Sequence, residues 1–481
     1  MPGGDPSSPL LQSPMSDPER SLKRTVLTIA CLSSFVVPFI GSSVNVALPS
    51  IGKEFRMDAV TLGWVPTSYL LASAMFLLPF GRMADIYGRK RVFWVGTSTF
   101  TLASLFTALS LSEGMLIAFR VVQGLGSAMT FGTAMAILTS VYPPAERGWA
   151  IGINTAAVYI GLSVGPFVGG ILTQYLGWRS LFYFTIPFGL AVLFLVFGRL
   201  KGEWAEAAGE KVDVRGSVLY ATSLLLIIYG LSRLPALSGL GLIGVGFLGL
   251  LGFFRVESLS PSPILNVKLF KNNPVFTFSN LAAFIHYSAT FAVTFLLSLY
   301  LQYSKGFSPR DAGSVLVAQP LMMAAFSPLA GRLSDRIEPR VLASLGMAVT
   351  AVSIFLLAGI GPTTGLAYIV FALLFLGFGF ALFSSPNTHA VMSSVERRFF
   401  GVASGTLGTM RLVGQMFSMG LALMIFALII GKTAVTPKLF PLFLRSVKTA
   451  LTVNGSLCLL GIFFSLARGN LKPSEKETQN G

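Results

Sequence analysis

The chain has 481 residues, of which 53% are hydrophobic and only 11% are charged. Soluble globular proteins carry about 25% charged residues, so this chain has too few to cover the surface of a soluble protein of its size. The apolar content excludes intrinsic disorder, and two separate cysteines, Cys31 and Cys458, exclude a disulfide scaffold. The net charge of +16 indicates a membrane protein whose cytoplasmic loops are rich in Lys and Arg. We do not ascribe this charge to a nucleic-acid partner.

Fourteen apolar stretches are long enough to cross a bilayer as helices, because a hydrocarbon core of about 30 Å requires about 20 residues. A membrane β-barrel would alternate apolar and polar residues, whereas helices satisfy every backbone polar group within lipid. The sequence Ser232–Pro235 predicts a tight turn between two short stretches. We therefore predict an all-α polytopic membrane protein with spans at 26–48, 62–82, 92–111, 115–139, 150–172, 181–198, 215–233, 239–256, 276–302, 312–331, 341–359, 365–387, 402–430 and 448–467.

The distribution of Lys and Arg predicts the orientation of these spans. With the N-terminus in the cytoplasm, the cytoplasmic segments carry 23 Lys and Arg and the outer segments carry 10, as the positive-inside rule requires. One outer segment, 431–448, is an exception to this rule because it carries four basic residues. Residues 1–24 and 469–481 are polar and lack an apolar core, so we expect cytoplasmic tails, the first of them disordered, and no signal peptide. We predict a plasma-membrane protein with both termini inside.

The sequence repeats itself at an offset of 250 residues. Residues 81–85 (GRMAD) recur as 331–335 (GRLSD), and residues 146–147 (ER) recur as 396–397. An even number of spans separates the copies, so both insert the same way up. Parallel halves that face each other across a central site are typical of rocking transporters. The repeat predicts a six-helix bundle at 25–198, a linker with two inserted helices at 199–275 and a second six-helix bundle at 276–468.

Several segments carry a resemblance to a known family. Residues 81–91 (GRMADIYGRKR) resemble the loop signature between spans 2 and 3 of the major facilitator superfamily, and residues 120–126 (RVVQGLG) resemble its span-4 signature. Residues 161–170 (GLSVGPFVGG) are similar to the span-5 signature of its antiporter branch. Together with residues 45–49 (NVALP), they indicate a likeness to the fourteen-span drug:proton antiporters. The resemblance covers residues 25–468 and implies the major facilitator fold.

The loop at 81–91 is the predicted gate. Gly81 and Gly88 permit a tight turn and a close helix approach. Asp85 can accept hydrogen bonds from nearby basic groups or lie at the positive N-terminus of a helix in the other half. The resemblance implies that Asp85 holds the halves together in the outward-open state, and its duplicate Asp335 occupies the equivalent corner. The alternative for Arg89 and its basic neighbours is that they only mark the cytoplasmic side.

The fifth predicted span carries a stripe of glycines. Gly161, Gly165 and Gly169 recur every four residues and so lie on one helix face. Small residues at this spacing let another helix approach closely, and Pro166 supplies a local kink. The resemblance adds Gly170 to this antiporter helix. We expect the stripe to provide close packing between the two halves, so the packing and functional interpretations agree.

Ionisable residues inside spans cost about 2.5–3.5 kcal/mol by insertion scales, so each suggests a function. Arg120, His286 and Arg411 lie within predicted spans, and Asp311 lies at a span end. The resemblance implies a proton-coupling or substrate role for Arg120. Histidine titrates near neutral pH, so we expect any proton-driven step to depend on His286 or on a carboxylate such as Asp311. The alternative in each case is a structural side chain with satisfied partners.

The predicted site lacks a buried acid. Fourteen-span drug:proton antiporters usually carry an aspartate in the first span at the position of Ile40. Without a buried carboxylate, Arg120 and Arg411 favour anionic, zwitterionic or neutral amphipathic solutes. Neutral polar side chains can orient a solute or form bonds between helices. The predicted cavity set is Asn45, Gln123, Asn154, Asn280, Gln319, Asn387 and Gln415.

These features favour a secondary active transporter that exports small amphipathic solutes or drugs by alternating access, coupled to protons. An importer or facilitator of a small anionic or neutral metabolite is the alternative on the same fold, and a membrane-embedded sensor or enzyme is a third. The sequence shows no catalytic or metal-ligand cluster and no P-loop. We expect no cofactor, no metal and no nucleic acid. The expected partners of the monomer are the bilayer, a small-molecule substrate and protons.

Overall fold

A computed structural model describes residues 17–260, 262–265, 267–334, 336–396, 400–431, 433 and 439–469 of the chain. The described part is helical throughout, as predicted. Its elements are α1 (Asp17–Phe55), α2 (Ala59–Tyr87), α3 (Arg89–Ala108), α4 (Glu113–Val141), α5 (Pro144–Leu176), α6 (Arg179–Gly198), α7 (Val214–Ser232), α8 (Leu237–Leu259), α9 (Val267–Asn272), α10 (Pro274–Leu299), the π-turn η1 (Tyr300–Ser304), α11 (Pro309–Leu316), α12 (Ala318–Ser334), α13 (Pro339–Ala358), α14 (Leu366–Ser393), α15 (Phe400–Ile429) and α16 (Phe440–Ala467).

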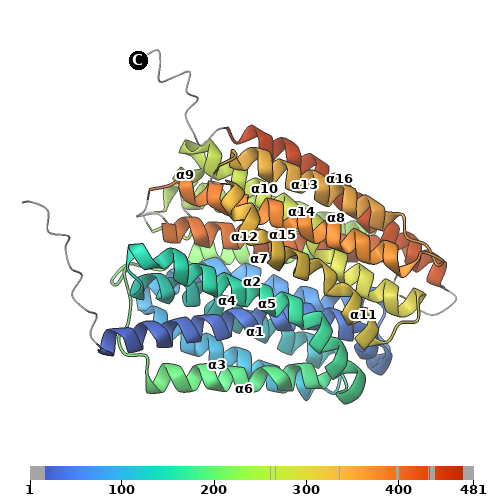
Figure 1. Ribbon diagram of the computed structural model, residues 1–481, viewed down its shortest axis with the longest axis horizontal. Coiled ribbons are helices and arrows are strands. Elements are labelled where there is room, and N and C mark those ends of the chain that lie inside the picture. The colour runs from blue at the N-terminus through green and yellow to red at the C-terminus, as the bar shows by residue number, and fades with distance from the viewer. Residues whose placement is uncertain are drawn as a thin grey trace, which may run out of the picture.

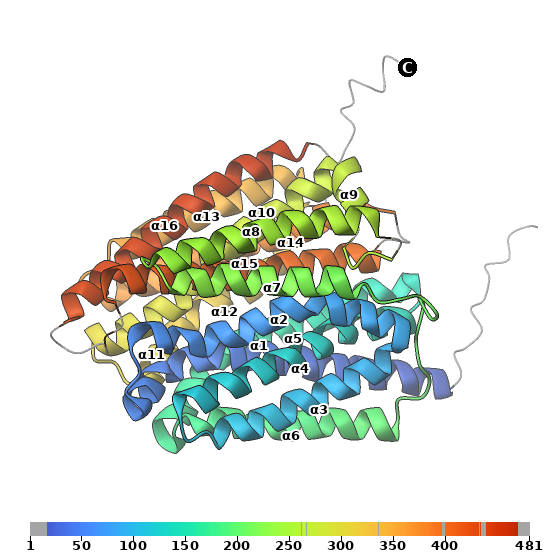
Figure 2. The same ribbon diagram turned by 180° about the vertical axis from the view of Figure 1, so that it is seen from behind.

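Within the described residues, 13 helices are long and apolar enough to cross a membrane, with α11 and α12 together forming one of them. The predicted span at 92–111 corresponds to α3, a 20-residue helix that is not among the 13. Three basic residues, 89–91, open α3, and Thr and Ser recur along it, which lowers its hydropathy. Helix α3 nevertheless packs lengthwise against α4 and α6 (Figure 2).

The first helix differs from its prediction. Helix α1 begins at Asp17, so residues 17–24, which we expected in the disordered tail, are helical. Two contacts with the end of α4 and the start of α5 explain the longer helix. Lys23 forms an ion pair of 2.9 Å with Glu146, and the Tyr142 hydroxyl donates a hydrogen bond of 3.0 Å to the Lys23 carbonyl. Residues 1–16 and 470–481 lie outside the described part of the chain.

The helices pack in two groups with a hairpin beside them (Figures 1 and 2). Helices α1 to α6 form one group, and α10 to α16, including the short α11 that continues into α12, form the other. Helices α7 and α8 form the predicted hairpin around the turn at 232–235, and α7 lies against α2 of the first group and α15 of the second. We call these groups the first half and the second half.

The two halves meet at one end of the molecule. Helix α1 begins and α16 ends at the same end, which we call the terminal end (Figure 1). The hydrogen bonds between the halves in the described residues lie toward the opposite end. There, Ser298 donates to the Asn45 carbonyl over 2.7 Å and Gln302 donates to the Val46 carbonyl over 2.9 Å.

Glycines mark the difference between the two ends. At the opposite end, a Cβ on Gly170 would come within 3.0 Å of the Arg310 Cα, so α5 and α11 are in backbone contact. Near the terminal end, a Cβ on Gly152 of α5 or on Gly405 of α15 would meet nothing within 4 Å. The halves are therefore closely packed at the opposite end, and these two glycines face open space near the terminal end.

Candidate substrate site and gate

Arg120 lies wholly inside the first half. Its guanidinium is fully buried on α4, and its Nε donates a hydrogen bond of 3.1 Å to the Val65 carbonyl of α2. Nη1 donates to Gln123, which in turn donates to Ser104 of α3 over 2.7 Å. The Tyr69 ring lies 4.3 Å from the Arg120 Cζ, a cation–π distance. These neutral partners satisfy a buried cation without a carboxylate and hold three helices together.

Arg411 has different surroundings. It lies on α15, is only partly buried, and donates one described hydrogen bond, of 2.6 Å, to Thr388 of α14. Among the described residues its buried Nε has no hydrogen-bond partner, and its Cζ lies 5.7 Å from the Tyr287 ring centre. Tyr287 packs with Phe380 and Met323, and the cluster extends to Tyr159 of the first half. Arg411 thus offers an uncommitted donor beside an aromatic cluster that both halves build.

His286 belongs to the same aromatic region. Its ring is fully buried on α10 and stacks on Phe383 with centroids 4.0 Å apart, while Phe380 lies edge-on at 4.9 Å. Neither ring nitrogen has a hydrogen-bond partner in the part of the chain that the structure describes. Asp311 lies far from this region, at the start of α11, where its carboxylate accepts a hydrogen bond of 2.7 Å from Ser308.

The structure disperses the predicted neutral polar residues. Gln123 accepts a hydrogen bond from Arg120, as described above. In three buried asparagines, Oδ1 has no hydrogen-bond partner within the described ranges: Asn45, Asn154 and Asn280. Gln319 is a distant acceptor for Thr294 at 3.5 Å. Gln415 lies on α15 one turn from Arg411 and is partly buried. That these residues line one cavity stays a prediction.

Sequence reasoning missed another buried arginine next to an apolar helix. Arg468 follows α16 and is 1% exposed; it donates to the Asn387 Oδ1 over 3.1 Å and to the Ser279 hydroxyl over 3.3 Å. Burial lowers the pKa of Arg468 to about 10, so the group stays charged at neutral pH. Asn387, predicted to line a cavity, is thereby committed to Arg468. The only sequence signal was a basic residue directly after an apolar stretch, which we assigned to the inner loops.

The glycine stripe faces a helix of its own half. Gly161 and Gly165 approach the backbone of α1 at Phe35 and Phe39, and Gly169 approaches Ser43. The expectation that these three residues pack between the halves is therefore wrong. Gly170 lies about 100° further around the helix, and this residue, with the Pro166 carbonyl, contacts α11 of the second half.

The gate loop is engaged by the linker that follows α6. Gly88 forms the turn between α2 and α3 with φ of +111°, a conformation that favours glycine. Asp85 pairs with Arg89 over 2.8 Å, and Arg89 also forms an ion pair of 2.8 Å with Glu206 of the linker. A Cβ on Gly81 would meet nothing within 4 Å. Asp335 lies outside the described residues, and among those described no group of three His, Cys, Asp or Glu could hold a metal ion.

The fold and these sites define a polytopic helical membrane protein built from two packed halves. Comparison with known proteins identifies its family: the Major Facilitator Superfamily profile matches residues 30–419 and 279–479. The chain therefore belongs to the Major Facilitator Superfamily and is a transporter, not an enzyme.

The named relatives include an export protein, a riboflavin transporter and a multidrug resistance protein. The chain is 33% identical over 414 residues to the cephamycin export protein CmcT of Amycolatopsis lactamdurans, covering 84% of this chain and 85% of the relative. It is 30% identical over 392 residues to the riboflavin transporter RibZ of Clostridioides difficile, covering 81% and 85%. It is also 30% identical to the multidrug resistance protein Stp of Mycobacterium tuberculosis (strain CDC 1551 / Oshkosh), covering 80% and 72%. These likenesses agree with a drug:proton antiporter-like member of the superfamily.

Solved structures agree on the fold. A bacterial homologue of the human lysosomal transporter Spinster, in an inward-facing and unoccupied conformation, matches with a TM-score of 0.69 at 17% identity, covering 94% of this chain and 98% of that chain. The human organic anion transporter MFSD10 matches with a TM-score of 0.60 at 15% identity, covering 94% and 100%. At this level of identity, the likeness concerns the fold alone.

Proposed function

We propose that the protein exports small amphipathic organic solutes from the cytoplasm across the plasma membrane by alternating access. The observation that carries the proposal is Arg411, a partly buried arginine with an unpartnered Nε beside an aromatic cluster shared by both halves. The relatives support the direction, since CmcT is an export protein and Stp a multidrug resistance protein.

The surroundings of Arg411 favour one substrate chemistry. A guanidinium with a free donor binds carboxylate, phosphate or polarised carbonyl oxygens strongly, because charge-assisted hydrogen bonds strengthen where water is excluded. Tyr287, Phe380 and Tyr159 supply flat apolar surface next to it. The described residues place no carboxylate within ion-pair distance of Arg411. Anionic, zwitterionic or neutral amphipathic solutes therefore fit better than cations.

The proposal includes a membrane arrangement. We assign fourteen spans in the order six, two and six, with α3 as the span of lowest hydropathy and α7 and α8 as the inserted pair. The terminal end faces the cytoplasm in this assignment, which puts the basic loops inside. The described structure, joined at the opposite end, is then the inward-facing state of a monomer.

The gate in this proposal is the loop at 81–91 with Asp335 of the repeat. Asp85 makes its contact with the second half only when the terminal end closes. Replacement of Asp85 by Asn removes the charge of that contact, so transport in proteoliposomes should fall while membrane insertion is unchanged. Transport at the unaltered rate would refute the gate.

Coupling to protons is assigned to His286 or to Asp311. His286 lies beside the aromatic cluster of Tyr287 and Phe380, and histidine is the side chain that most readily exchanges a proton near neutral pH. Asp311 lies on α11, which contacts α5 of the other half. Under an imposed pH gradient, His286→Phe and Asp311→Asn separate the two: the variant that still transports but no longer responds to the gradient identifies the coupling residue.

The experiment that tests the proposed function is transport by purified protein in proteoliposomes of matched anionic, neutral and cationic aromatic solutes, with and without a pH gradient. We expect anions and neutral solutes to be moved, and Arg411→Met to abolish the preference for anions. Arg233→Met, a change in the exposed turn after α7, is the matched control. Selective transport of cations that survives Arg411→Met would overturn the proposal.

The second candidate is an importer or facilitator of a small anionic or neutral metabolite, and one observation favours it: the likeness to the riboflavin transporter RibZ. Proteoliposomes distinguish direction through the sign of the driving gradient. Accumulation against a gradient toward the cytoplasmic side would favour the importer, and transport indifferent to pH would favour a facilitator.

A further inference from the structure

The segment between α6 and α7 is folded onto the gate loop. Leu200 is 2% exposed and packs in the first-half core with Trp204. The Trp204 carbonyl accepts a hydrogen bond of 2.8 Å from the Arg89 amide, and the Ala207 amide donates one of 2.9 Å to the Asp85 carbonyl. The linker is therefore a built part of the first half, with its backbone joined to the turn between α2 and α3.

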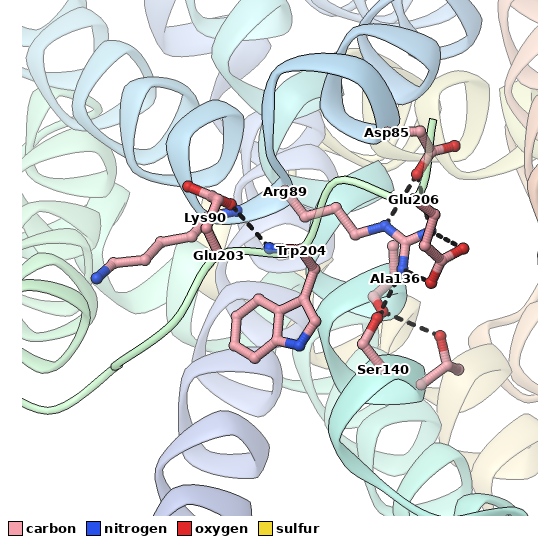
Figure 3. A network of polar contacts seen from close by, with 9 residues as sticks. Asp85, Arg89, Lys90, Ala136, Ser140, Glu203, Trp204 and Glu206 are labelled. Atoms are coloured by element: carbon pink, nitrogen blue, oxygen red, sulfur yellow. Dashed lines mark hydrogen bonds and ion pairs between the residues drawn. The ribbon is translucent and has the colours of Figure 1, made fainter. Parts of the chain in front are cut away.

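The linker supplies a helix cap that the turn between α2 and α3 lacks. Helix α3 begins directly after Gly88, which has no side chain to cap it, and the Lys90 amide instead donates 2.7 Å to the Glu203 carboxylate (Figure 3). An acidic group at this position caps the helix and interacts favourably with the helix dipole. A Cβ on Gly88 would collide with the Glu203 carboxylate. Gly88 thus permits both the turn and the approach of the linker.

Glu206 makes the central contact of the linker (Figure 3). Its two carboxylate oxygens accept hydrogen bonds of 2.8 and 3.0 Å from Nη1 and Nη2 of Arg89, the paired geometry that is strongest for arginine. Arg89 is 8% exposed and also donates to Asp85 over 2.9 Å and to Ser140 over 2.6 Å. One buried cation is therefore shared by two carboxylates.

The charges of this triad have a consequence for the gate. With Arg89 positive and both Asp85 and Glu206 negative, the group carries a formal charge of −1. Without Glu206, Arg89 would neutralise Asp85 completely. The carboxylate of Asp85 would then offer little attraction to a positive group or helix N-terminus of the second half.

The second half does not repeat this arrangement. At the offset of 250, Pro339 stands where the first half has Arg89, and Ala390 stands where it has Ser140. Glu206 itself belongs to the linker, which exists once. The shared arginine is thus specific to the first-half loop and is not a general feature of the repeated hairpin.

We propose that Glu206 is a positioning residue of the transport cycle: it takes up the charge of Arg89, so that Asp85 keeps the negative charge with which it holds the terminal end closed. The inference rests on the proposed gate function of Asp85. In this arrangement, the linker contributes to the balance between the two conformations through one carboxylate.

The test measures conformation directly. Spin labels on exposed positions of opposite halves, 149 on α5 and 402 on α15, report by pulsed EPR whether the terminal end is open or closed. The background carries Cys31→Ser and Cys458→Ser, and the protein is full-length in proteoliposomes. We expect Glu206→Gln to lower the ratio of closed to open molecules about threefold, the size typical of a partly exposed ion pair. Transport should fall in parallel.

Two matched variants isolate the charge on Arg89. Glu203→Gln makes the same charge change on the same segment but keeps an oxygen acceptor for the Lys90 amide, so the closed fraction should stay unchanged. The double variant Glu206→Gln with Arg89→Gln restores the charge of the triad to −1, so it should recover closure relative to Glu206→Gln alone. A merely structural role for Glu206 predicts no such recovery.

The outcomes separate the two proposals. An unchanged closed fraction in Glu206→Gln, in a background where Asp85→Asn does lower it, overturns the role of Glu206 and leaves the gate intact. If Asp85→Asn also leaves the closed fraction unchanged, the gate itself fails. A fall in Glu206→Gln that the double variant does not recover overturns the charge argument. Gel-filtration profiles of every variant confirm that each one folds.

Discussion

Arg120 and Arg411 are both arginines inside apolar helices without an acidic partner, yet the two halves treat them differently. Arg120 is fully buried, and its donors go to neutral groups of α2 and α4 in its own half. Arg411 is partly buried and, among the described residues, has one hydrogen bond and an orphaned Nε. A buried cation whose Nε is bonded to a neighbouring helix and whose Nη1 is bonded to Gln123 holds helices together, whereas a cation with a free donor can bind something else. The second half is therefore the better place to look for the substrate.

The largest expected effect is the loss of stability in Arg120→Ala. This variant leaves a cavity in place of a large buried side chain and an orphaned Gln123 carbonyl, so the free energy of unfolding should fall by about 3 kcal/mol. Arg411→Ala, at a partly exposed position, should cost less than about 1 kcal/mol. Thermal unfolding of both proteins in detergent, followed by intrinsic fluorescence, makes the comparison.

A methionine control sharpens this prediction. Met fills much of the space of Arg120 and needs no hydrogen-bond partner, so Arg120→Met should recover most of the loss seen with Ala. If Arg411→Ala were as destabilising as Arg120→Ala, the distinction between the two arginines would be broken.

Gln123→Leu should have the next largest effect. It leaves Arg120 charged, buried and short of one acceptor, which costs about 2 kcal/mol. Gln123→Glu would supply a carboxylate in the same place and should be less harmful in the same unfolding assay. Wild-type stability in Gln123→Leu would mean that the aromatic faces of Tyr69 and Phe182 alone suffice for the cation.

The sequence predicted the helices better than it predicted the side-chain contacts of the candidate site. Apolar stretches mark helices in lipid because the backbone has no other solution there, so the hairpin of α7 and α8 and the turn at 232–235 were predictable. The sequence shows that Arg120 and Arg411 lie inside apolar stretches, where a charge is energetically costly. It does not show which groups they contact. Whether Arg120 finds the Val65 carbonyl depends on how α2 packs against α4, and no periodicity within either helix encodes that contact.

The contacts of the linker were likewise not predictable from the sequence. Glu203, Glu206 and Glu210 lie in the linker predicted at 199–275, and the sequence analysis assigns them no role. Their spacing was a usable signal, because the loop at 81–91 presents basic residues in similar number. Predicting that Glu206 reaches Arg89 would still have required the path of the chain after α6, which Leu200 and Trp204 fix by packing.

Arg411→Met comes third, and it acts on transport. Loss of the guanidinium should raise the half-saturating concentration of an anionic aromatic solute about tenfold, equivalent to about 1.4 kcal/mol, while a neutral analogue changes little. Arg411→Lys keeps the charge but not the planar fork, so it should recover only part of the loss. An equal effect on neutral and anionic solutes would show that Arg411 shapes the site and does not bind the anion.

Thr388→Val should produce the smallest effect, and it decides whether Arg411 is free or held. The Thr388 hydroxyl is the one described hydrogen-bond partner of Arg411, at 2.6 Å, and Val removes this hydroxyl while it keeps the shape of the side chain. If the free donors of Arg411 bind the solute, the half-saturating concentration should rise only about twofold, because one neutral hydrogen bond contributes about 0.5–1.5 kcal/mol and the solute replaces part of it. Thr388→Ser, which keeps the hydroxyl, should behave as wild type. A tenfold rise in Thr388→Val, matching Arg411→Met, would mean that Arg411 works through its bond to α14. In that case Arg411 would be a structural residue like Arg120, and the substrate would have to be sought elsewhere between the halves.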